Sequence, residues 1–430
     1  MKKISDIVTI GFALFAMFFG AGNLLLPPFI GLQIGTHIWI TILAFALTGI
    51  LLPFMGIISV NNSGDNFNDL GRRVHPQLAP ILGSIIMICI GPLIAIPRTA
   101  ATTFEVGVLP SFPDSNPIWT SIIFFAATWL FAIVPSKVVD LVGNFLTPFL
   151  LILLTILVVS GIIHPTAVPT ERSVSTTEAF SFGFMEGYQT LDVLASVVFA
   201  GIIIAATKTK GYASTKEKSK VVIAAGALAA FCLLCIYGGL IYLGSTSGIT
   251  NLDIKRSELL IHISRTVLGE YGTLAIALSI ALACLTTAIA VTAAVGTFFS
   301  ELTGGRISYK ILVTICCLIS AVLSITGVDN IIQFAYPPLA FVYPIVITLV
   351  LYIVIFGRFI TSKLPYIGAL IATTLIASLG LLNMFDLLAP QVLVQLNRIP
   401  YFEYELGWVV PSIVFFVLFF AIEKIRSLRN

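Results

Sequence analysis

Backbone groups are the first candidates for chemistry in this sequence. An apolar segment covers about residues 7–34, and its middle holds four residues that disfavour a regular helix: Gly20, Gly22, Pro27 and Pro28. An interruption in a membrane-spanning helix leaves N–H and C=O groups without partners, which is tolerated only where they line a cavity within the protein. The stretch from Gly20 to Pro28 is therefore predicted to bind a ligand.

A carboxylate within a later apolar segment is the second candidate. The residues E-G-Y-Q-T-L-D run from Glu186 to Asp192, and a purely apolar run begins only at Val193. A carboxylate at membrane depth is costly unless it is paired, hydrated or coordinating a cation. The alternative is that Asp192 lies at the headgroup boundary and caps a helix. We expect a second helix interruption here, with Asp192 available to a cation.

Composition indicates the elements that must position these groups. Of the 430 residues, 58% are hydrophobic and 10% are charged, and the mean hydropathy is +1.06, whereas soluble chains carry about 25% charged residues. The apolar runs last about 18–28 residues, which favours transmembrane helices over the ~10-residue strands of a barrel. We expect an all-α integral membrane protein that contacts lipid. The basic residues lie in short loops, so no nucleic-acid partner is expected.

Twelve transmembrane helices are predicted from the apolar runs. They cover about residues 7–34, 38–60, 77–103, 117–136, 139–163, 185–207, 219–245, 271–300, 309–327, 331–357, 363–385 and 406–425. With the N-terminus in the cytoplasm, 17 of the 23 Lys and Arg residues fall on the inner side. Because positive residues favour cytoplasmic loops, both termini are expected to be cytoplasmic.

The two interrupted spans are the first and the sixth, which suggests an inverted repeat of five plus five helices. The expected units are residues 1–163 with spans one to five, 164–357 with spans six to ten, and 358–430 with two accessory spans. Transporters of this design bind substrate near the bilayer midplane, where the half-helix ends meet.

Three stretches resemble one bacterial family. They are F-F-G-A-G-N-L-L-L-P-P-F-I-G (Phe18–Gly31), G-P-L-I-A-I-P-R-T-A-A-T-T-F-E-V-G (Gly91–Gly107) and G-Y-Q-T-L-D-V-L-A-S-V-V-F-A (Gly187–Ala200). They look like the branched-chain amino acid:cation symporter family (LIVCS), which has the LeuT-like fold of the amino acid–polyamine–organocation superfamily. The resemblance implies uptake of leucine, isoleucine and valine with sodium through the bacterial inner membrane.

A more distant similarity to sodium-coupled amino acid transporters implies site residues. Their first-span pattern, Gly-x-Gly-Asn and a later proline, matches Gly20, Gly22, Asn23 and Pro28. Their sixth-span Thr-Leu-Ser corresponds to Thr190, Leu191 and Asp192, and their eighth-span hydroxyl pair to Thr286 and Thr287. Asp192 replaces serine in this comparison, and the added charge leaves the identity of the ion open.

The substrate would meet three kinds of receptor. Its carboxylate would bind backbone N–H groups at Gly20–Gly22 and the positive end of the following half-helix. Its ammonium would bind freed carbonyls, with Asp192 as a further candidate acceptor, and its side chain would enter a dry pocket. The residues expected to contact it are Ala21, Gly22, Asn23, Leu24, Gln189, Leu191, Asp192, Ala195 and Val291.

Sodium prefers several oxygen ligands, as other hard cations do. One expected site combines the carbonyls of Ala16, Phe19 and Ala283 with the hydroxyls of Thr286 and Thr287. A second combines Asn23, Thr190 and Asp192. The alternatives are that the two adjacent threonines bond to carbonyls one turn earlier, and that Asn23 caps a half-helix.

An outer gate is a further expectation. Arg98 is placed toward the outer end of the third span, where it could close a vestibule by pairing with Glu105 or Glu186. The alternative is an interfacial arginine whose charge reaches the headgroups.

The sequence leaves rival functions. The first is a sodium-coupled importer that works by alternating access. The second is a proton-coupled or uncoupled exchanger or facilitator on the same fold, because a buried carboxylate such as Asp192 can carry a proton. An enzyme is disfavoured because the four histidines lie near span ends or in loops: His37, His75, His164 and His262. No covalent cofactor is expected, and the oligomeric state is not predicted.

Overall fold

The computed structural model describes residues 2–72, 74–212 and 214–429, without the side chains of residues 2, 21, 135–137, 329, 332–335, 403 and 427–429. This part of the chain is helical and has no strand. Eight helices in it are long and apolar enough to cross a membrane, or up to nine when a sharply bent pair is counted as one span. The prediction of an all-α, multi-pass membrane protein is confirmed.

The helices follow the predicted apolar runs. The first half contains α1 (Lys2–Phe18), α2 (Ala21–Ile34), α3 (Ile38–Ala46), α4 (Leu52–Ser63), α5 (Phe67–Arg72), α6 (Leu78–Ile88), α7 (Ile96–Thr102), α8 (Pro117–Ala132), α9 (Pro135–Leu141) and α10 (Thr147–Ile163). The second half contains α11 (Thr176–Tyr188), α12 (Asp192–Thr209), α13 (Thr215–Ser245), α14 (Arg256–Leu268), α15 (Gly272–Leu302), α16 (Tyr309–Ser324), α17 (Val328–Phe356), α18 (Leu364–Met384), α19 (Pro390–Leu396) and α20 (Val409–Arg429). Short π-helical segments join several of the first set: Leu47–Leu51, Cys89–Ala95, Thr103–Val108 and Val142–Leu146.

The number of spans is not settled by helix length. Two predicted spans correspond to α8 and α16, which are apolar but have only 16 residues each. A helix of that size is about 24 Å long, less than the ~30 Å of hydrocarbon it would cross. The twelve-span count and the inverted repeat therefore stay predictions.

The first predicted interruption is real but shorter than expected. α1 and α2 are bent by 68° relative to each other, and the two residues between the helices are Phe19 and Gly20. The expectation that the break reaches Pro28 is wrong, because Pro27 and Pro28 both lie inside α2. Tertiary packing outweighs their low helix propensity, as it often does in membrane helices.

The helix α2 packs so closely against α13 that their backbones are in contact. A Cβ atom on Gly244 would overlap the carbonyl oxygen of Pro28, and one on Gly31 would overlap the carbonyl of Ile241. Small residues allow membrane helices to approach this closely. The contact holds α2 helical through its prolines.

The second interruption lies between α11 and α12. Leu191 has φ 59° and ψ 17°, the left-handed conformation that few non-glycine residues adopt, and α12 begins at the following residue, Asp192. The prediction of a helix break beside Asp192 is confirmed.

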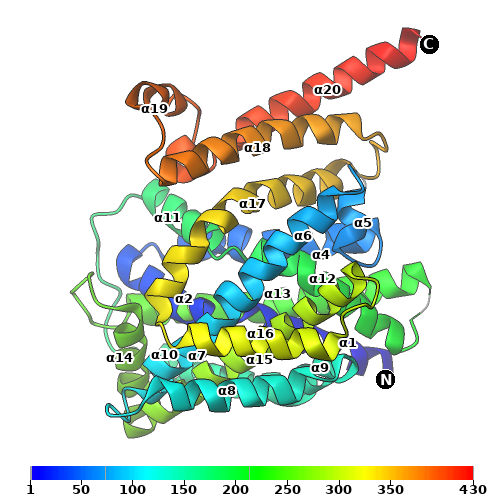
Figure 1. The fold of residues 1–430 in the computed structure, drawn as a ribbon. Coiled ribbons are helices and arrows are strands. Elements are labelled where there is room, and N and C mark those ends of the chain that lie inside the picture. Colours follow the sequence, from blue (N-terminus) through cyan, green and yellow to red (C-terminus); the bar gives the residue numbers. More distant parts are fainter. Residues whose placement is uncertain (1, 73, 213, 430) are drawn as a thin grey trace.

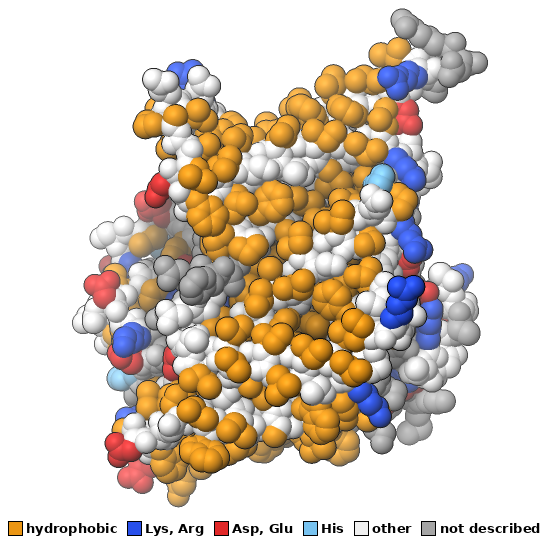
Figure 2. Space-filling model, viewed as in Figure 1, with side chains coloured by type: hydrophobic (Ala, Val, Ile, Leu, Met, Phe, Trp, Pro, Cys, Tyr) orange, Lys and Arg blue, Asp and Glu red, His pale blue; other side chains and the backbone are white. Residues whose placement is uncertain are grey.

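The arrangement of the helices separates a central group from an accessory layer. Figure 1 shows α18 and α20 side by side along one edge of the molecule, with α18 packed against α17. Both termini lie on the same side of the molecule. Figure 2 shows Lys and Arg side chains gathered along that side, beyond a broad hydrophobic surface.

Candidate functional site

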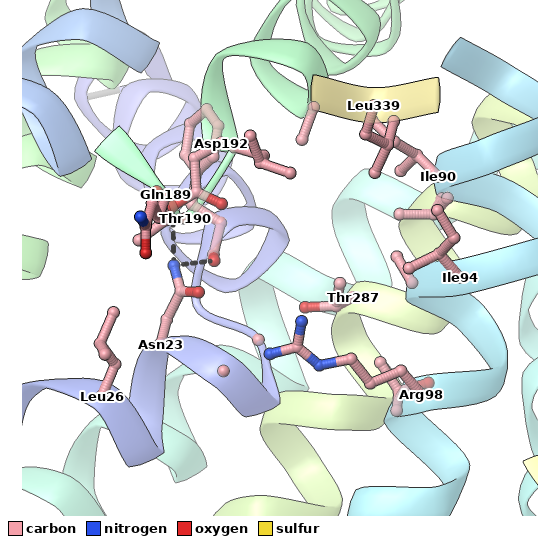
Figure 3. Close-up of a pocket in the computed structure, with 18 of the residues that line it drawn as sticks. Asn23, Leu26, Ile90, Ile94, Arg98, Gln189, Thr190, Asp192, Thr287 and Leu339 are labelled. Carbon is pink, nitrogen blue, oxygen red and sulfur yellow. Dashed lines mark hydrogen bonds between the residues drawn. The ribbon is translucent and has the colours of Figure 1, made fainter. Parts of the chain in front are cut away.

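A cavity of about 540 Å³ lies where the two interruptions meet. Its lining comes from both breaks, from the third span around α7, and from α15 and α17 (Figure 3). It extends from Asp192 and Thr287 to Glu186 near the end of α11 and to the half-exposed Arg256 at the start of α14. The cavity thus connects the two breaks to one face of the protein.

The polar wall of the cavity joins the two breaks directly. The side-chain amide of Asn23 on α2 donates a hydrogen bond of 2.8 Å to Oδ2 of Asp192 on α12. The same nitrogen donates to the carbonyl of Phe18 at 3.0 Å. Thr190 lines the cavity and donates to the carbonyl of Gly187 at 2.8 Å. The three residues of the second expected ion site therefore lie together.

Tyr237 on α13 is a contributor that sequence reasoning missed. Its hydroxyl accepts from Nδ2 of Asn23 at 2.7 Å, and its ring packs against Phe19 and Phe45 with centroid distances of 5.7 and 5.4 Å. The residue is 1% exposed. A phenol in the middle of an apolar span was the available signal, since a buried hydroxyl requires a partner.

The hydroxyl pair on α15 meets the end of α1. Thr286 and Thr287 both donate to the carbonyl of Ala16, at 3.3 and 3.2 Å. Thr286 also donates to the carbonyl of Ala283 at 3.0 Å, which is the local bonding that the alternative interpretation expected. Phe19 is fully buried and stacks on Phe15. Four of the five residues of the first expected ion site thus converge through oxygen atoms.

The apolar wall differs from the expected one in detail. Ala195 and Val291 line the cavity as predicted, as do Gln189 and Leu191. Leu24 is fully buried and does not line it. Leu25 and Leu26 line it instead, because the helical turn of α2 directs their side chains differently. The side chain of Ala21 lies outside the described residues.

Additional apolar residues come from elements that the sequence did not connect to the site. Ile90, Ile94 and Leu339 contribute to the wall opposite Asn23, as Figure 3 shows. Ile90 and Ile94 belong to the π-helical segment Cys89–Ala95, whose Gly91 has a non-helical ψ of −113°. This local kink places the third span against the cavity.

The structure does not bring the expected gate residues together. Val328 N–H donates to Oε1 of Glu105 at 3.1 Å. Arg256 lies 3.8 Å from the Glu186 carboxylate, and its guanidinium carbon is 4.9 Å from the centroid of Phe29. Arg98 lies on α7 in the second half of the third span, and it pairs with neither glutamate within the described residues. Its guanidinium points into the cavity beside Thr287 (Figure 3).

The break in the sixth span is also held from the accessory helices. Trp408 Nε1 donates to the hydroxyl of Tyr188 at 3.2 Å, and both side chains are buried. Tyr336, which lines the cavity, donates to the Glu405 carboxylate at 2.9 Å. The sequence offered no signal for these pairs, which join distant parts of the chain.

A second cavity of about 500 Å³ lies between the start of α5 and the ends of α12 and α15. Asp65, one of its lining residues, pairs with Lys208 at the end of α12 and with Lys218 on α13, the latter at 2.6 Å. The hydrogen bonds from the two ammonium groups lower the pKa of Asp65 below its ordinary value. Phe199 lines the first cavity and its neighbour Val198 the second, so only a thin layer of α12 separates them.

Comparison with known proteins places this geometry among transport proteins. Residues 3–426 match the model of a family described as branched-chain amino acid transport protein. The chain is 37% identical to branched-chain amino acid permease BraB of Bacillus subtilis over 421 residues, which cover 96% of this chain and 94% of that protein. It is also 37% identical to permease BrnQ of the same organism over 430 residues, covering 96% of both.

Solved structures share the fold at much lower identity. A mutant form of the manganese transporter of Eremococcus coleocola has a TM-score of 0.64 at 13% identity and covers 96% of this chain and 95% of its own. Mhp1, a nucleobase-cation-symport-1 family transporter in a closed conformation, has a TM-score of 0.59 at 11% identity, with 98% and 93% coverage. At such identities the comparison shows the fold alone.

Proposed function

This chain belongs to the branched-chain amino acid transport protein family, and from that premise we propose that it imports leucine, isoleucine and valine by secondary active transport coupled to sodium. The family is one of transporters and not of enzymes. The observation that carries the proposal is the cavity at the meeting of the two helix breaks, where Asp192 faces an apolar wall. A small zwitterion with a hydrocarbon side chain suits both halves of that lining.

The polar half would receive the ammonium group. The Asp192 carboxylate is held by Asn23, and Asn23 is in turn held by Phe18 and Tyr237. A carboxylate fixed in this way presents its other oxygen without having to reorganise when the substrate arrives. An ammonium group donates up to three hydrogen bonds, so Asp192 and freed carbonyls of the breaks are suitable partners.

The apolar half would receive the branched side chain. Ile90, Ile94 and Leu339 lie on the wall away from Asn23, and Val291 also lines the cavity. An apolar pocket separates ligands that differ by one methylene by only about 1–3 kcal/mol. Leucine, isoleucine and valine are therefore all expected to be transported.

Sodium is the proposed coupling ion because oxygen atoms converge where α15 meets the end of α1. The Thr286 hydroxyl lies within hydrogen-bonding distance of the carbonyls of Ala16 and Ala283, and the Thr287 hydroxyl lies within that distance of the Ala16 carbonyl. Carbonyl and hydroxyl oxygens are ligands that hard cations prefer. An ion here would tie α15 to the first break, and substrate would tie the same break to α12.

Alternating access is supported by the two cavities. The first cavity reaches Glu186 and Arg256, and the second lies beside the basic side of the protein, with α12 between them. We place the basic side and both termini in the cytoplasm of a bacterial cell, since Lys and Arg favour cytoplasmic loops. Movement of one five-helix repeat against the other would then open the cavities in turn.

Coupling to protons, or to no ion, is the rival candidate. Asp192 favours it, because a carboxylate buried beside the substrate could carry a proton. The two candidates differ in their response to the imposed gradients.

The test is uptake of labelled isoleucine into proteoliposomes with sodium and proton gradients imposed independently. Sodium coupling predicts saturable accumulation that requires an inward sodium gradient and collapses when choline replaces sodium at constant pH. Accumulation driven by the proton gradient alone would instead establish the rival. Failure to take up any of the three amino acids under all gradients would contradict the proposed function.

A further inference from the structure

Arg98 is a charged side chain in the main cavity that the proposed function has not used. It lies on α7 in the second half of the third span, which extends from Leu78 to Val108. Its side chain is only partly exposed. A cation at membrane depth is costly unless an anion or hydrogen-bond acceptors compensate it.

No direct hydrogen bond or ion pair to the guanidinium is present in the described part of the chain. The two carboxylates first expected to pair with it have other partners: Glu105 accepts from Val328 N–H, and Glu186 faces Arg256. Asp192 lies on another wall, where it accepts from Asn23. Arg98 therefore presents free donors to the cavity.

The position of the guanidinium is defined by Gly22. A Cβ atom on Gly22 would overlap Nη2 of Arg98, so the absence of a side chain at that position admits the charge. Gly22 belongs to the first turn of α2, whose backbone N–H groups have no partner within their own helix. Arg98 and the start of α2 thus present donors to the same part of the cavity.

We propose that Arg98 binds the α-carboxylate of the substrate, together with the first turn of α2. The inference rests on the proposed function. The sequence alone predicted that backbone N–H groups bind the substrate carboxylate, and the structure adds a side chain to them. A guanidinium matches a carboxylate with two parallel N–H···O bonds. Asp192 would bind the ammonium and Arg98 the carboxylate, so the site would recognise both charges of a free amino acid. It therefore selects against amides, esters and simple amines with the same side chain.

Binding competition between leucine and leucinamide tests the assignment. Leucinamide retains the ammonium and the side chain but replaces the carboxylate with a neutral amide. Displacement of labelled leucine from the purified protein in sodium buffer gives the two affinities, and their ratio measures carboxylate recognition. We expect the unmodified protein to prefer leucine on the order of 100-fold, in line with truncation of a buried charged pair.

Two variants should remove this preference. Arg98→Gln should lower leucine affinity and leave leucinamide affinity equal or higher, so that the ratio falls to within about 10-fold of unity. Gly22→Ala should lower the ratio through the same group, because its methyl would displace the guanidinium while leaving the charge present. If Arg98→Gln does not fold, Gly22→Ala provides the test. This variant is expected to fold, because the atom that its methyl must displace, Arg98 Nη2, lies at the end of a flexible side chain.

Matched controls separate recognition from general effects. Arg256→Gln removes the same charge from the lining of the same cavity, but Arg256 already faces Glu186. It should preserve the ratio even if both affinities change. Gly107→Ala adds the same methyl in the third span but outside the cavity lining, where its nearest neighbour would be the carbonyl oxygen of Ala277 at 3.6 Å. It too should preserve the ratio.

The outcomes that overturn the assignment are distinct. An unchanged ratio in Arg98→Gln, or in Gly22→Ala if the first variant is unfolded, would exclude Arg98 as the carboxylate receptor. A different result would assign Arg98 to an inorganic anion instead. In that case leucine affinity would change when methanesulfonate replaces chloride, and the ratio of leucine to leucinamide affinity would be the same in the variants as in the unmodified protein. Absence of leucine binding by the unmodified protein would overturn the proposed function and not the geometry of Arg98.

Discussion

The amide nitrogen of Asn23 lies 2.8 Å from Oδ2 of Asp192, although 169 positions separate them in the sequence. Each residue stands beside a helix interruption, so this hydrogen bond joins the two breaks. A change at either residue is expected to act on both half-helix ends and on whatever binds between them.

Asp192→Asn is expected to abolish coupled uptake without unfolding the protein. The amide retains the size of the carboxylate but loses the charge that an ammonium or a cation requires. Loss of a charge-assisted hydrogen bond is worth about 1.5–3 kcal/mol, or roughly 10- to 150-fold in affinity. Isoleucine uptake and size-exclusion profiles would be compared with the unmodified protein. Ion-driven accumulation at the normal rate would rule out a coupling role for Asp192.

Thr287→Ala should raise the sodium concentration needed for half-maximal uptake. Its hydroxyl lies 3.2 Å from the carbonyl of Ala16 and lines the cavity, so the variant removes one proposed oxygen ligand. The loss of one such contact, about 1 kcal/mol, corresponds to roughly a fivefold change. The measurement is the sodium dependence of initial uptake rates.

Thr292→Ala provides the control for this change. It makes the same substitution on α15 at a buried hydroxyl that does not line the cavity. Its sodium curve should match that of the unmodified protein. Equal curves for both variants would remove Thr287 from the ion site.

Tyr237→Phe should lower both stability and substrate affinity. The hydroxyl is one of three acceptors that surround the Asn23 amide, with the Phe18 carbonyl and Asp192 Oδ2, and the loss of one such hydrogen bond costs about 1 kcal/mol. Thermal unfolding in detergent and leucine affinity would be measured together. Tyr343→Phe is the matched control, because the Tyr343 hydroxyl is buried without a partner in the described structure. A larger loss in that control would contradict the assigned role of Tyr237.

The inner ion cluster should make stability depend on pH. Lys208 and Lys218 lower the pKa of Asp65 below 3.8, so the carboxylate is protonated less readily in the folded protein than in the unfolded chain. The resulting stabilisation is fully present above about pH 4 and is lost as pH falls through the folded pKa. The melting-temperature difference between the unmodified protein and Asp65→Asn should therefore shrink below that pH. A difference that is constant between neutral pH and about pH 3 would exclude this linkage.

Local sequence signals predicted the fold class and the positions of the breaks. Long apolar runs require helices in a membrane, since every backbone polar group there must be bonded within its own segment. Gly20 and the polar residues before Asp192 disrupt such runs, and the structure interrupts the helices at Phe19–Gly20 and at Gln189–Leu191. The same signals overestimated the first break, because Pro27 and Pro28 are held within α2 by its contact with α13.

The partners of the site residues depended on tertiary structure. The sequence by itself determined that Asn23, Asp192, Thr286 and Thr287 are polar groups in apolar spans, which must find partners or ligands. Only the packing of the helices decided which partners they find. Asn23 hydrogen-bonds to Tyr237, and Trp408 hydrogen-bonds to Tyr188. Arg98 lies against Gly22, whereas Glu105 and Glu186 have other partners. Hydropathy and spacing indicate how deep in the membrane a residue lies and on which face of its helix. A hydrogen bond between two helices depends in addition on how those helices cross, and the crossing is determined by all the side chains packed between them.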